Sequence, residues 1–339
     1  MKAAYLKQYG TASDAFEIRE IDRPTPGPDQ VLIKVEAFGI DFADVMARLG
    51  LYQGAPPLPA LLGYDVVGYV EECGAEVEHL EIGDRVTALT RFGGYAEYAV
   101  AGKSVSHQVP EDLAPGAAVA LSTQYCTAYF LSLVMANLQE NDKVLIHAAA
   151  GGVGTALVQM ALHRKCIVFG TCGSKEKISY LEENGVHHPI NYRQVDFVDA
   201  IQEIIGTQGL DAIFDPVGGK SIKKGFRLLG AGGRIMSFGV SSMNQTKNIF
   251  GKLRVLAQFG IYHPLQFLSA SKGMIGVNML KIADDNPGKI AQVMQSVIQM
   301  TEDGILRPFV GGTFSIDQLA EAHAFIESRK SMGKVVVKW

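Results

Sequence analysis

Cysteine is scarce in this chain, with four residues in 339 positions: Cys73, Cys126, Cys166 and Cys172. They are too few and too scattered for a disulfide framework, and they fit a reducing compartment. Neither charge is in clear excess, because the chain has 31 basic and 35 acidic residues. This composition gives no support for a nucleic-acid partner. The first residues lack the apolar core of a signal peptide. We therefore expect a cytoplasmic protein of about two domains.

A second absence is local: residues 113–139 contain no Asp, Glu, Lys or Arg. An uncharged run of this length could cross a bilayer. However, Pro115-Gly116 interrupts its start, and serine, threonine, glutamine and asparagine residues are spread along it. These features favour a buried helix of a soluble protein, so we predict no membrane span.

The hydrophobic pattern changes along the chain. Short alternating runs such as Val31–Ala37 and Asp65–Val70 predict strands in the first hundred residues, separated by proline and glycine turns. From about Gln139, apolar strands alternate with helical patterns, which is typical of a parallel sheet covered by helices. The fold class is therefore predicted as α/β, with a doubly wound parallel-sheet domain inserted into a β-rich domain that the final strand, residues 333–338, rejoins.

One glycine-rich segment has the context of a nucleotide-binding loop: Ala148-Ala149-Ala150-Gly151-Gly152-Val153-Gly154. It lies between an apolar strand and a helical pattern. Such a loop turns tightly and lets its backbone approach a pyrophosphate at the N-terminus of the helix. A purely structural turn is the alternative, but the strand before and the helix after are what the motif requires. We predict a dinucleotide site here.

The next strand discriminates between the two nicotinamide dinucleotides. NAD enzymes usually place an acid about 20 residues after the glycines. Here the chain reads Gly170-Thr171-Cys172-Gly173-Ser174-Lys175-Glu176-Lys177, with no acid before Ser174. A hydroxyl and an ammonium near a helix N-terminus favour a 2′-phosphate, and therefore NADP(H). In the alternative interpretation Ser174 only caps the helix and the lysines are solvated, although capping and phosphate binding are compatible.

Five further segments, taken together with the glycine loop, form a pattern that no single one of them shows. They are Gly39-Ile40-Asp41-Phe42-Ala43-Asp44, Gly50-Leu51-Tyr52, Leu62-Gly63-Tyr64-Asp65-Val66-Val67-Gly68, Gly93-Gly94-Tyr95-Ala96-Glu97-Tyr98 and Asn191-Tyr192-Arg193. With the glycine loop, they resemble the zinc-independent quinone-oxidoreductase branch of the medium-chain dehydrogenase/reductase family, and within it the vesicle amine transport protein-like group. The resemblance implies a GroES-like catalytic domain over residues 1–122 and 276–339. It also implies a Rossmann NADP-binding domain over residues 123–275 and a homodimer.

The chain departs from zinc-dependent relatives at two places. They carry a cysteine in the segment that here holds Asp41, and a Gly-His-Glu motif where this chain has Gly63-Tyr64-Asp65. The four closely spaced cysteines of a structural zinc lobe are also missing. Because zinc prefers cysteine and histidine ligands, we expect no zinc.

The resemblance assigns the cofactor contacts. Lys177 and Tyr192 match residues at the adenosine 2′-phosphate, although Tyr192 on its own is typical of a surface turn. Arg329 and Gly333 match a segment that closes over the cofactor. His147 is interpreted as a core histidine rather than a proton donor. The remaining predicted contacts lie in the pyrophosphate loop, beside the nicotinamide and along the cofactor: Gly151, Gly152, Val153, Phe238, Gly239, Val240, Thr127, Gly173 and Ser174.

The candidate catalytic residues are Asp41, Tyr52 and Tyr64. Without a metal, the negative charge that develops on the hydride acceptor must be stabilised by other donors, which favours a quinone or an α,β-unsaturated carbonyl. Asp41 stands where the family usually has asparagine, and an ionised carboxylate cannot donate a hydrogen bond. Either it is protonated in a buried site, or it has another task, such as capping the following helix.

Two functions remain open at this point. The first is an NADPH-dependent reductase with a small-molecule substrate. The second is an NADPH-binding scaffold or transport-associated protein with little activity, suggested by Asp41 and by Met46, where related oxidoreductases often have tyrosine. The substrate pocket is expected in the loops 52–61 and 243–264. The second loop has aromatic residues at Phe250, Phe259 and Tyr262, with Phe267 just beyond it, although this stretch is equally consistent with a core helix.

Overall fold

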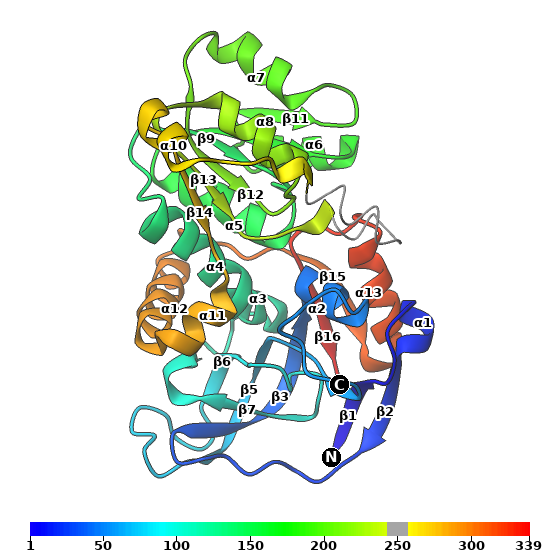
Figure 1. Ribbon diagram of the computed structural model, residues 1–339. Coiled ribbons are helices and arrows are strands. Elements are labelled where there is room, and N and C mark those ends of the chain that lie inside the picture. Colours follow the sequence, from blue (N-terminus) through cyan, green and yellow to red (C-terminus); the bar gives the residue numbers. More distant parts are fainter. Residues whose placement is uncertain (243–256) are drawn as a thin grey trace. The chain divides into compact units, whose positions relative to one another are not determined.

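The computed structural model describes residues 1–242 and 257–339 and divides into two compact units, which Figure 1 labels by element. Unit 1 combines Met1–Cys126 with Leu280–Trp339, and unit 2 is Thr127–Met279. The boundaries predicted from the sequence lie a few residues earlier at both junctions. Phe250 and the rest of residues 243–256, part of the expected pocket loop, lie outside the described residues.

Unit 1 is built on two sheets. The smaller has the order β2-β1-β4, with β1 Lys2–Leu6, β2 Phe16–Glu20 and β4 Ala60–Leu61. The larger runs β15-β16-β3-β5-β6-β8, and β7 also pairs with β3. Its strands are β3 Gln30–Ile40, β5 Asp65–Cys73, β6 Arg85–Leu89, β7 Tyr98–Gly102, β8 Ser106–Gln108, β15 Val310–Ser315 and β16 Lys334–Lys338.

The C-terminal strand is an interior strand of the larger sheet. β16 pairs antiparallel with β3, with Val336 opposite Gly39, and parallel with β15. Its three consecutive valines are buried, which suits a strand that is covered on both faces. The final residues of the chain therefore complete the unit that its first residues begin, as the sequence pattern predicted.

Helices cover unit 1. They are α1 Ala12–Ala15, α2 Phe42–Arg48, η1 Lys103–Val105, α3 Pro115–Ala120, η2 Leu121–Tyr125, α11 Met279–Asp285, α12 Pro287–Glu302, η5 Ile316–Gln318 and α13 Leu319–Glu327. A capping box formed by Ser315 and Gln318 precedes α13. The core of this unit includes Phe38, Ile40, Leu62, Tyr95 and Val337.

The uncharged stretch forms a continuous helix over Pro115–Met135, with π-helical segments at η2 and at η3 Phe130–Met135, and the short α4 Cys126–Tyr129 between them. The helix is long and apolar enough to cross a membrane, judged by length and composition alone. However, 72% of its most apolar window is buried inside the protein, as in the core helices of soluble proteins. This burial agrees with the predicted core helix.

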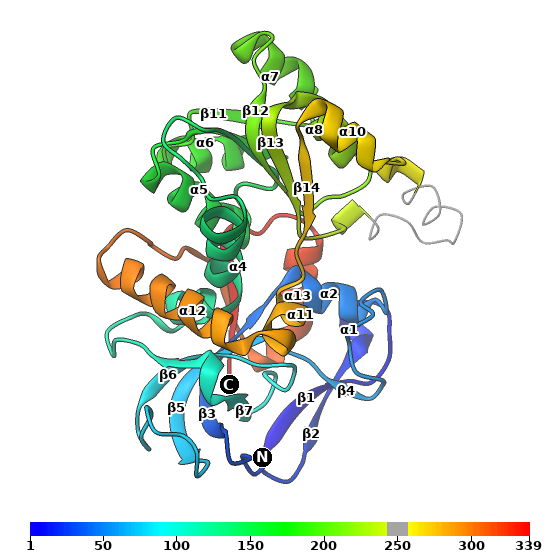
Figure 2. The same cartoon turned by 60° about the vertical axis from the view of Figure 1, so that its left-hand side comes forward.

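Unit 2 is a doubly wound parallel sheet with the order β11-β10-β9-β12-β13-β14. Its strands are β9 Lys143–Ile146, β10 Ile167–Cys172, β11 His188–Asn191, β12 Leu210–Asp215, β13 Leu229–Ser237 and β14 Gly273–Gly276. The intervening helices are α5 Gly152–His163, α6 Lys175–Glu183, α7 Phe197–Ile205, α8 Lys220–Leu228 and α10 Pro264–Ala270. In Figure 2, α5 and α6 lie on one side of the sheet and α8 and α10 on the other.

The strand order reverses between β9 and β12. From β9 the chain moves outward through β10 and β11, then returns to β12 on the other side of β9 and moves outward again through β13 and β14. In open parallel sheets, ligands bind at the carboxyl ends of the strands beside such a reversal. We therefore expect a ligand to bind at the segments that follow β9, β10, β12 and β13.

Candidate functional site

The glycine loop follows β9 and leads directly into α5. Gly151 is the N-cap residue of α5, and no side chain caps this helix. The first amides of an α-helix have no partner within the helix, so those of Gly152 and Val153 are available to an anion. A Cβ at Gly154 would overlap with the Ala148 carbonyl oxygen and lie 2.8 Å from the Ala149 carbonyl carbon. Glycine at position 154 is therefore required for the tight turn.

The end of β10 has the features expected for a 2′-phosphate. Ser174 is the N-cap residue of α6, and its Oγ accepts a hydrogen bond of 3.3 Å from the Lys177 amide. The capping interpretation is thus correct as geometry, and the hydroxyl stays beside the first turn of the helix, where Lys177 also lies. No acidic residue stands between the end of β10 and Ser174.

Tyr192 lies against Gly173. A Cβ at Gly173 would be 2.6 Å from the Tyr192 hydroxyl oxygen and 3.4 Å from Arg193 Nε. The Tyr192 side chain is 43% exposed, and its amide donates to the Cys172 carbonyl oxygen. The structure therefore brings Gly173, Ser174, Lys177 and Tyr192 together at the ends of β10 and β11.

Sequence reasoning missed Arg193 as a cation of this cluster. It belongs to the Asn191-Tyr192-Arg193 segment, but only the pairing of β10 with β11 shows that its guanidinium approaches Gly173. A second cation near Gly173, in addition to Lys177 on α6, increases the suitability of this corner for a phosphate.

Phe238, Gly239 and Val240 follow β13, beside the segment after β12. The Phe238 amide donates to the Asp215 carbonyl oxygen, and a Cβ at Gly239 would lie 2.7 Å from the Pro216 carbonyl oxygen. Asp215 in turn accepts from the amides of Val217 and Gly218, at 2.6 and 2.9 Å. The predicted nicotinamide segment is thus held firmly at the carboxyl edge of the sheet.

His147 is buried at the end of β9, where its Nδ1 lies 3.0 Å from Thr171 Oγ1. Its Nε2 has no hydrogen-bond partner among the described residues. Burial lowers the pKa of His147, while the charge of Asp215 acts in the opposite direction. The imidazole is therefore neutral near pH 7, as the core interpretation requires.

The other predicted cofactor residues are divided between the units. Thr127 is buried in α4 of unit 2. Arg329 and Gly333 flank the segment between α13 and β16 in unit 1, and both have left-handed backbones, with φ of 60° and 57°. Apart from Thr127, the NADP(H) contacts predicted within unit 2 follow β9, β10, β11 and β13, at the carboxyl edge of the sheet.

The three candidate catalytic residues lie in unit 1, around the N-terminus of α2. The rings of Tyr52 and Tyr64 pack edge to face, with centroids 6.1 Å apart. Burial is the main cause that raises the pKa of both phenols, and for Tyr64 the charge of Asp44 adds to it. Both hydroxyls therefore keep their protons at neutral pH, and both can donate a hydrogen bond.

Asp41 is the N-cap residue of α2 and forms a capping box with Asp44, in agreement with the capping alternative, and its carboxylate has two further partners. Oδ1 accepts from Gln124 Nε2 at 2.8 Å, and Oδ2 accepts from Lys334 Nζ at 2.9 Å. The Asp41 amide donates to Asp44 Oδ2 at 2.8 Å. The two aspartates thus cap the start of α2 together, and Asp41 also binds a lysine that sequence reasoning did not single out.

Lys334 is fully buried and contacts a second carboxylate. Its Nζ lies 2.6 Å from Asp65 Oδ2, and neither side chain is exposed to solvent. Burial lowers the pKa of Lys334, but the Asp41 and Asp65 carboxylates outweigh this effect and raise it, so the ammonium is charged. Burial likewise raises the pKa of Asp65, against the opposing charge of Lys334.

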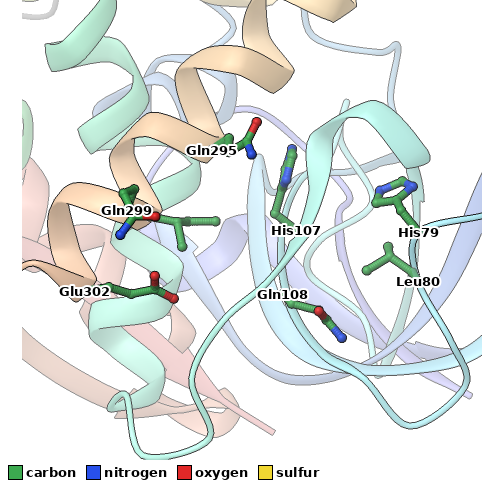
Figure 3. Close-up of a pocket in the computed structure, with 8 residues that line it drawn as sticks. His79, Leu80, His107, Gln108, Gln295, Gln299 and Glu302 are labelled. Carbon is green, nitrogen blue, oxygen red and sulfur yellow. The ribbon is translucent and has the colours of Figure 1, made fainter.

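A separate hollow of about 240 Å³ lies elsewhere in unit 1 (Figure 3). One face of α12 contributes Gln295, Gln299 and Glu302 to it, opposite His79 and His107. None of the predicted catalytic or cofactor residues is among those that line it. It is therefore distinct from the cluster around Asp41.

The chain is similar to two family models and to several known proteins. A zinc-binding dehydrogenase model matches residues 184–337, and an alcohol dehydrogenase GroES-like domain model matches residues 27–111. The synaptic vesicle membrane protein VAT-1 homolog of Danio rerio is 33% identical over 93% of this chain. The match covers 65% of that relative, slightly less than two thirds of its length. Human quinone oxidoreductase is 30% identical, over 99% of this chain and 97% of its own length.

Two solved structures have a similar fold over nearly the whole chain. A mycobacterial protein in complex with NADPH gives a TM-score of 0.87 at 26% identity, covering 100% of both chains. The CurK enoyl reductase gives 0.86 at 26% identity, covering 99% of this chain and 98% of its own. The predicted fold class, an α/β chain with a GroES-like domain and a Rossmann-type parallel-sheet domain, is confirmed.

The name of the first family model implies zinc, and the residues of unit 1 do not fit it. Asp41 and Tyr64 stand in the segments where zinc-dependent relatives carry cysteine and histidine. The space between Asp41 and Asp65 already holds the Lys334 ammonium. Within residues 1–242 and 257–339, no group of three or more histidine, cysteine or acidic side chains could hold a metal ion.

Proposed function

Because the chain belongs to the zinc-independent quinone-oxidoreductase branch of the medium-chain dehydrogenase/reductase family, we propose that it transfers hydride from NADPH to a quinone or an α,β-unsaturated carbonyl. The observation that supports NADPH best is the corner formed by Gly173, Ser174, Lys177 and Tyr192, with Arg193 as a further cation. The quinone oxidoreductase and enoyl reductase relatives support the acceptor class.

In this proposal each part of unit 2 holds one part of the cofactor. The amides of Gly152 and Val153 bind the pyrophosphate, with Gly151 at the turn. Ser174, Lys177, Tyr192 and Arg193 bind the 2′-phosphate. Phe238, Gly239, Val240 and Thr127 position the nicotinamide end, and Arg329 and Gly333 belong to the segment proposed to cover the cofactor. The nicotinamide supplies the hydride.

The tyrosines of unit 1 are proposed to stabilise the charge that develops on the acceptor oxygen. Tyr52 and Tyr64 keep their protons because burial raises their pKa values. A neutral hydroxyl held in a buried site is an effective donor to a developing oxyanion. Asp41 does not serve as a donor in this arrangement, since both of its oxygens accept hydrogen bonds. We propose that it shapes the site through its contact with Lys334.

Stopped-flow oxidation of NADPH with a panel of quinones and enals tests this function. We expect turnover with at least one acceptor and a preference for NADPH over NADH. The Tyr64→Phe variant should lower kcat roughly 10- to 100-fold without changing NADPH affinity, because it loses only a donor. Absence of turnover with every acceptor would count strongly against the proposal.

The second candidate is an NADPH-binding scaffold or transport-associated protein with little activity. It is favoured by Asp41 in place of the usual asparagine and by the VAT-1 relatives. Tight NADPH binding without turnover by the wild-type chain would support it. If Asp41→Asn then restored turnover, the chain would instead be an enzyme whose activity has been lost or narrowed.

The remaining proposals concern the state of the protein. We propose a cytoplasmic homodimer that has no membrane span and binds no nucleic acid. The edge strand β14 has a partner on one side only in the described sheet, so its other side can pair with a second copy. Size-exclusion chromatography with light scattering gives the mass directly.

A further inference from the structure

Lys334 is an unusual component of a protein core. It is the first residue of β16, and its side chain has no exposed surface. Transfer of an ammonium ion from water to a protein interior costs several kcal/mol, and its ion pairs recover this only when the geometry is good. Here Nζ lies 2.6 Å from Asp65 Oδ2 and 2.9 Å from Asp41 Oδ2, so one cation bridges two carboxylates.

The backbone provides the space for this bridge. Gly39 on β3 stands opposite Val336 of β16, two positions from the lysine and therefore on the same face of the strand. A Cβ at Gly39 would overlap with Asp65 Oδ1 and with Cε and Nζ of Lys334. The absence of a side chain at this one position thus allows the ammonium and the carboxylate to meet inside the sheet.

The surroundings of Lys334 are rich in oxygen and negative charge. Asp41 faces it from the start of α2, Asp65 from β5, and Asp44 from the first turn of α2. Burial, followed by the charge of Asp41, raises the pKa of Asp44. The Gln124 amide also reaches Asp41, and the Thr123 hydroxyl reaches Asp65. Without a cation, this set would hold buried carboxylates with no compensating charge.

We propose that the Lys334 ammonium is the resident cation of this site, standing between Asp41 and Asp65 in place of a metal ion, and that its removal creates a site for a divalent cation. The available ligand atoms would be the oxygens of Asp41, Asp65 and Gln124, together with water. Such an all-oxygen set suits a hard cation such as Mn²⁺ better than zinc. This proposal does not depend on the proposed reductase function, because metal binding can be measured in the absence of turnover.

Titration of the full-length chain with Mn²⁺ tests the proposal, with free Mn²⁺ followed by electron paramagnetic resonance. We expect Lys334→Ala to bind one Mn²⁺ at least tenfold more tightly than the wild type does. The double variant Lys334→Ala/Asp65→Asn should lose this binding. Lys338→Ala, an exposed lysine at the other end of β16, is the matched control and should behave as the wild type.

Two results would overturn the proposal. One is a folded Lys334→Ala chain that binds Mn²⁺ no better than the wild type. The other is a wild-type chain that already binds Mn²⁺ in a manner abolished by Asp65→Asn, because the lysine would then leave the position open.

If Lys334→Ala does not fold by itself, its refolding in the presence of an added cation tests the proposal instead. Trp339 is the only tryptophan and follows β16 directly, so its fluorescence reports on this region. Refolding should then be restored by Mn²⁺ or by propylammonium, which replaces the deleted part of the side chain. Failure of both cations to restore folding would contradict the proposal.

Discussion

At the scale of single residues, burial determines which side chains of unit 1 can donate a proton or a hydrogen bond. Tyr95 is fully buried, and burial raises its pKa, as it does for Tyr52 and Tyr64. The charge of Asp44 raises all three pKa values further, and the charge of Asp41 adds to those of Tyr64 and Tyr95. All three tyrosines are therefore neutral hydrogen-bond donors at physiological pH.

The first residue-scale prediction concerns the choice of cofactor. Lys177→Ala should weaken NADPH binding roughly tenfold and leave NADH binding nearly unchanged, because only NADPH carries the 2′-phosphate that the ammonium would contact. Fluorescence titration with both dinucleotides measures this. Lys175→Ala, an exposed lysine of the same helical turn, is the control. Equal weakening for both dinucleotides would place Lys177 away from the phosphate.

Residues whose partners are close in sequence could be predicted, and residues with distant partners could not. Ser174 and its contact with Lys177 lie within one helical turn, so the cap could be inferred from the local pattern. Lys334 lies 293 positions from Asp41 and 269 from Asp65. Nothing in a C-terminal strand pattern indicates that its lysine is buried, because the burial depends on which strands become neighbours.

At the scale of elements, the β9–loop–α5 connection is the part of the site that the sequence specified best. The strand, the glycines and the helix are contiguous, and each has its own pattern. The registers that place Arg193 beside Gly173, or Gly39 beside Lys334, are contacts between separate strands. Strand order follows from the packing of the whole sheet, which local propensity does not encode.

The element-scale prediction concerns the turn before α5. Gly154→Ala should lower NADPH affinity at least tenfold and also lower Tm, since its Cβ would overlap with the Ala148 carbonyl oxygen and force the loop open. Calorimetric titration and thermal unfolding measure the two effects. Gly288→Ala, in the first turn of α12 with open space around it, is the control. Unchanged binding by Gly154→Ala would show that the loop does not hold the pyrophosphate.

At the scale of the whole molecule, each unit contains a buried histidine that resists protonation. His323 in unit 1 is fully buried, with Nε2 3.1 Å from the Tyr95 hydroxyl oxygen. Burial, followed by the charge of Arg48, lowers its pKa well below the usual value, and burial lowers that of His147 in unit 2. On acidification below about pH 6.5, the unfolded chain therefore takes up protons before the folded chain does.

Although the raised pKa values of Asp44 and Asp65 act in the opposite direction, the contribution of the two histidines to stability should fall with acidification. It is fully present above about pH 6.5 and should decline below it, by up to about 1.4 kcal/mol per pH unit for each of these histidines. Urea unfolding between pH 7.5 and 5.5 measures the slope. His323→Gln should remove the part of the slope that His323 contributes, so that the variant loses less stability on acidification than the wild type, whatever its effect at pH 7.5. An identical slope in the variant would show that His323 is protonated equally in the folded and unfolded chains.

Gly39 also has a consequence for protein engineering. A methyl group at position 39 would occupy the space of the ion pair. Positions 39, 41, 65 and 334, which lie on three strands and at a helix start, therefore depend on one another. A designer who grafts the lysine into a related scaffold without the glycine would introduce a steric overlap rather than a cation. The four positions have to be exchanged together, although they span almost the entire length of the chain.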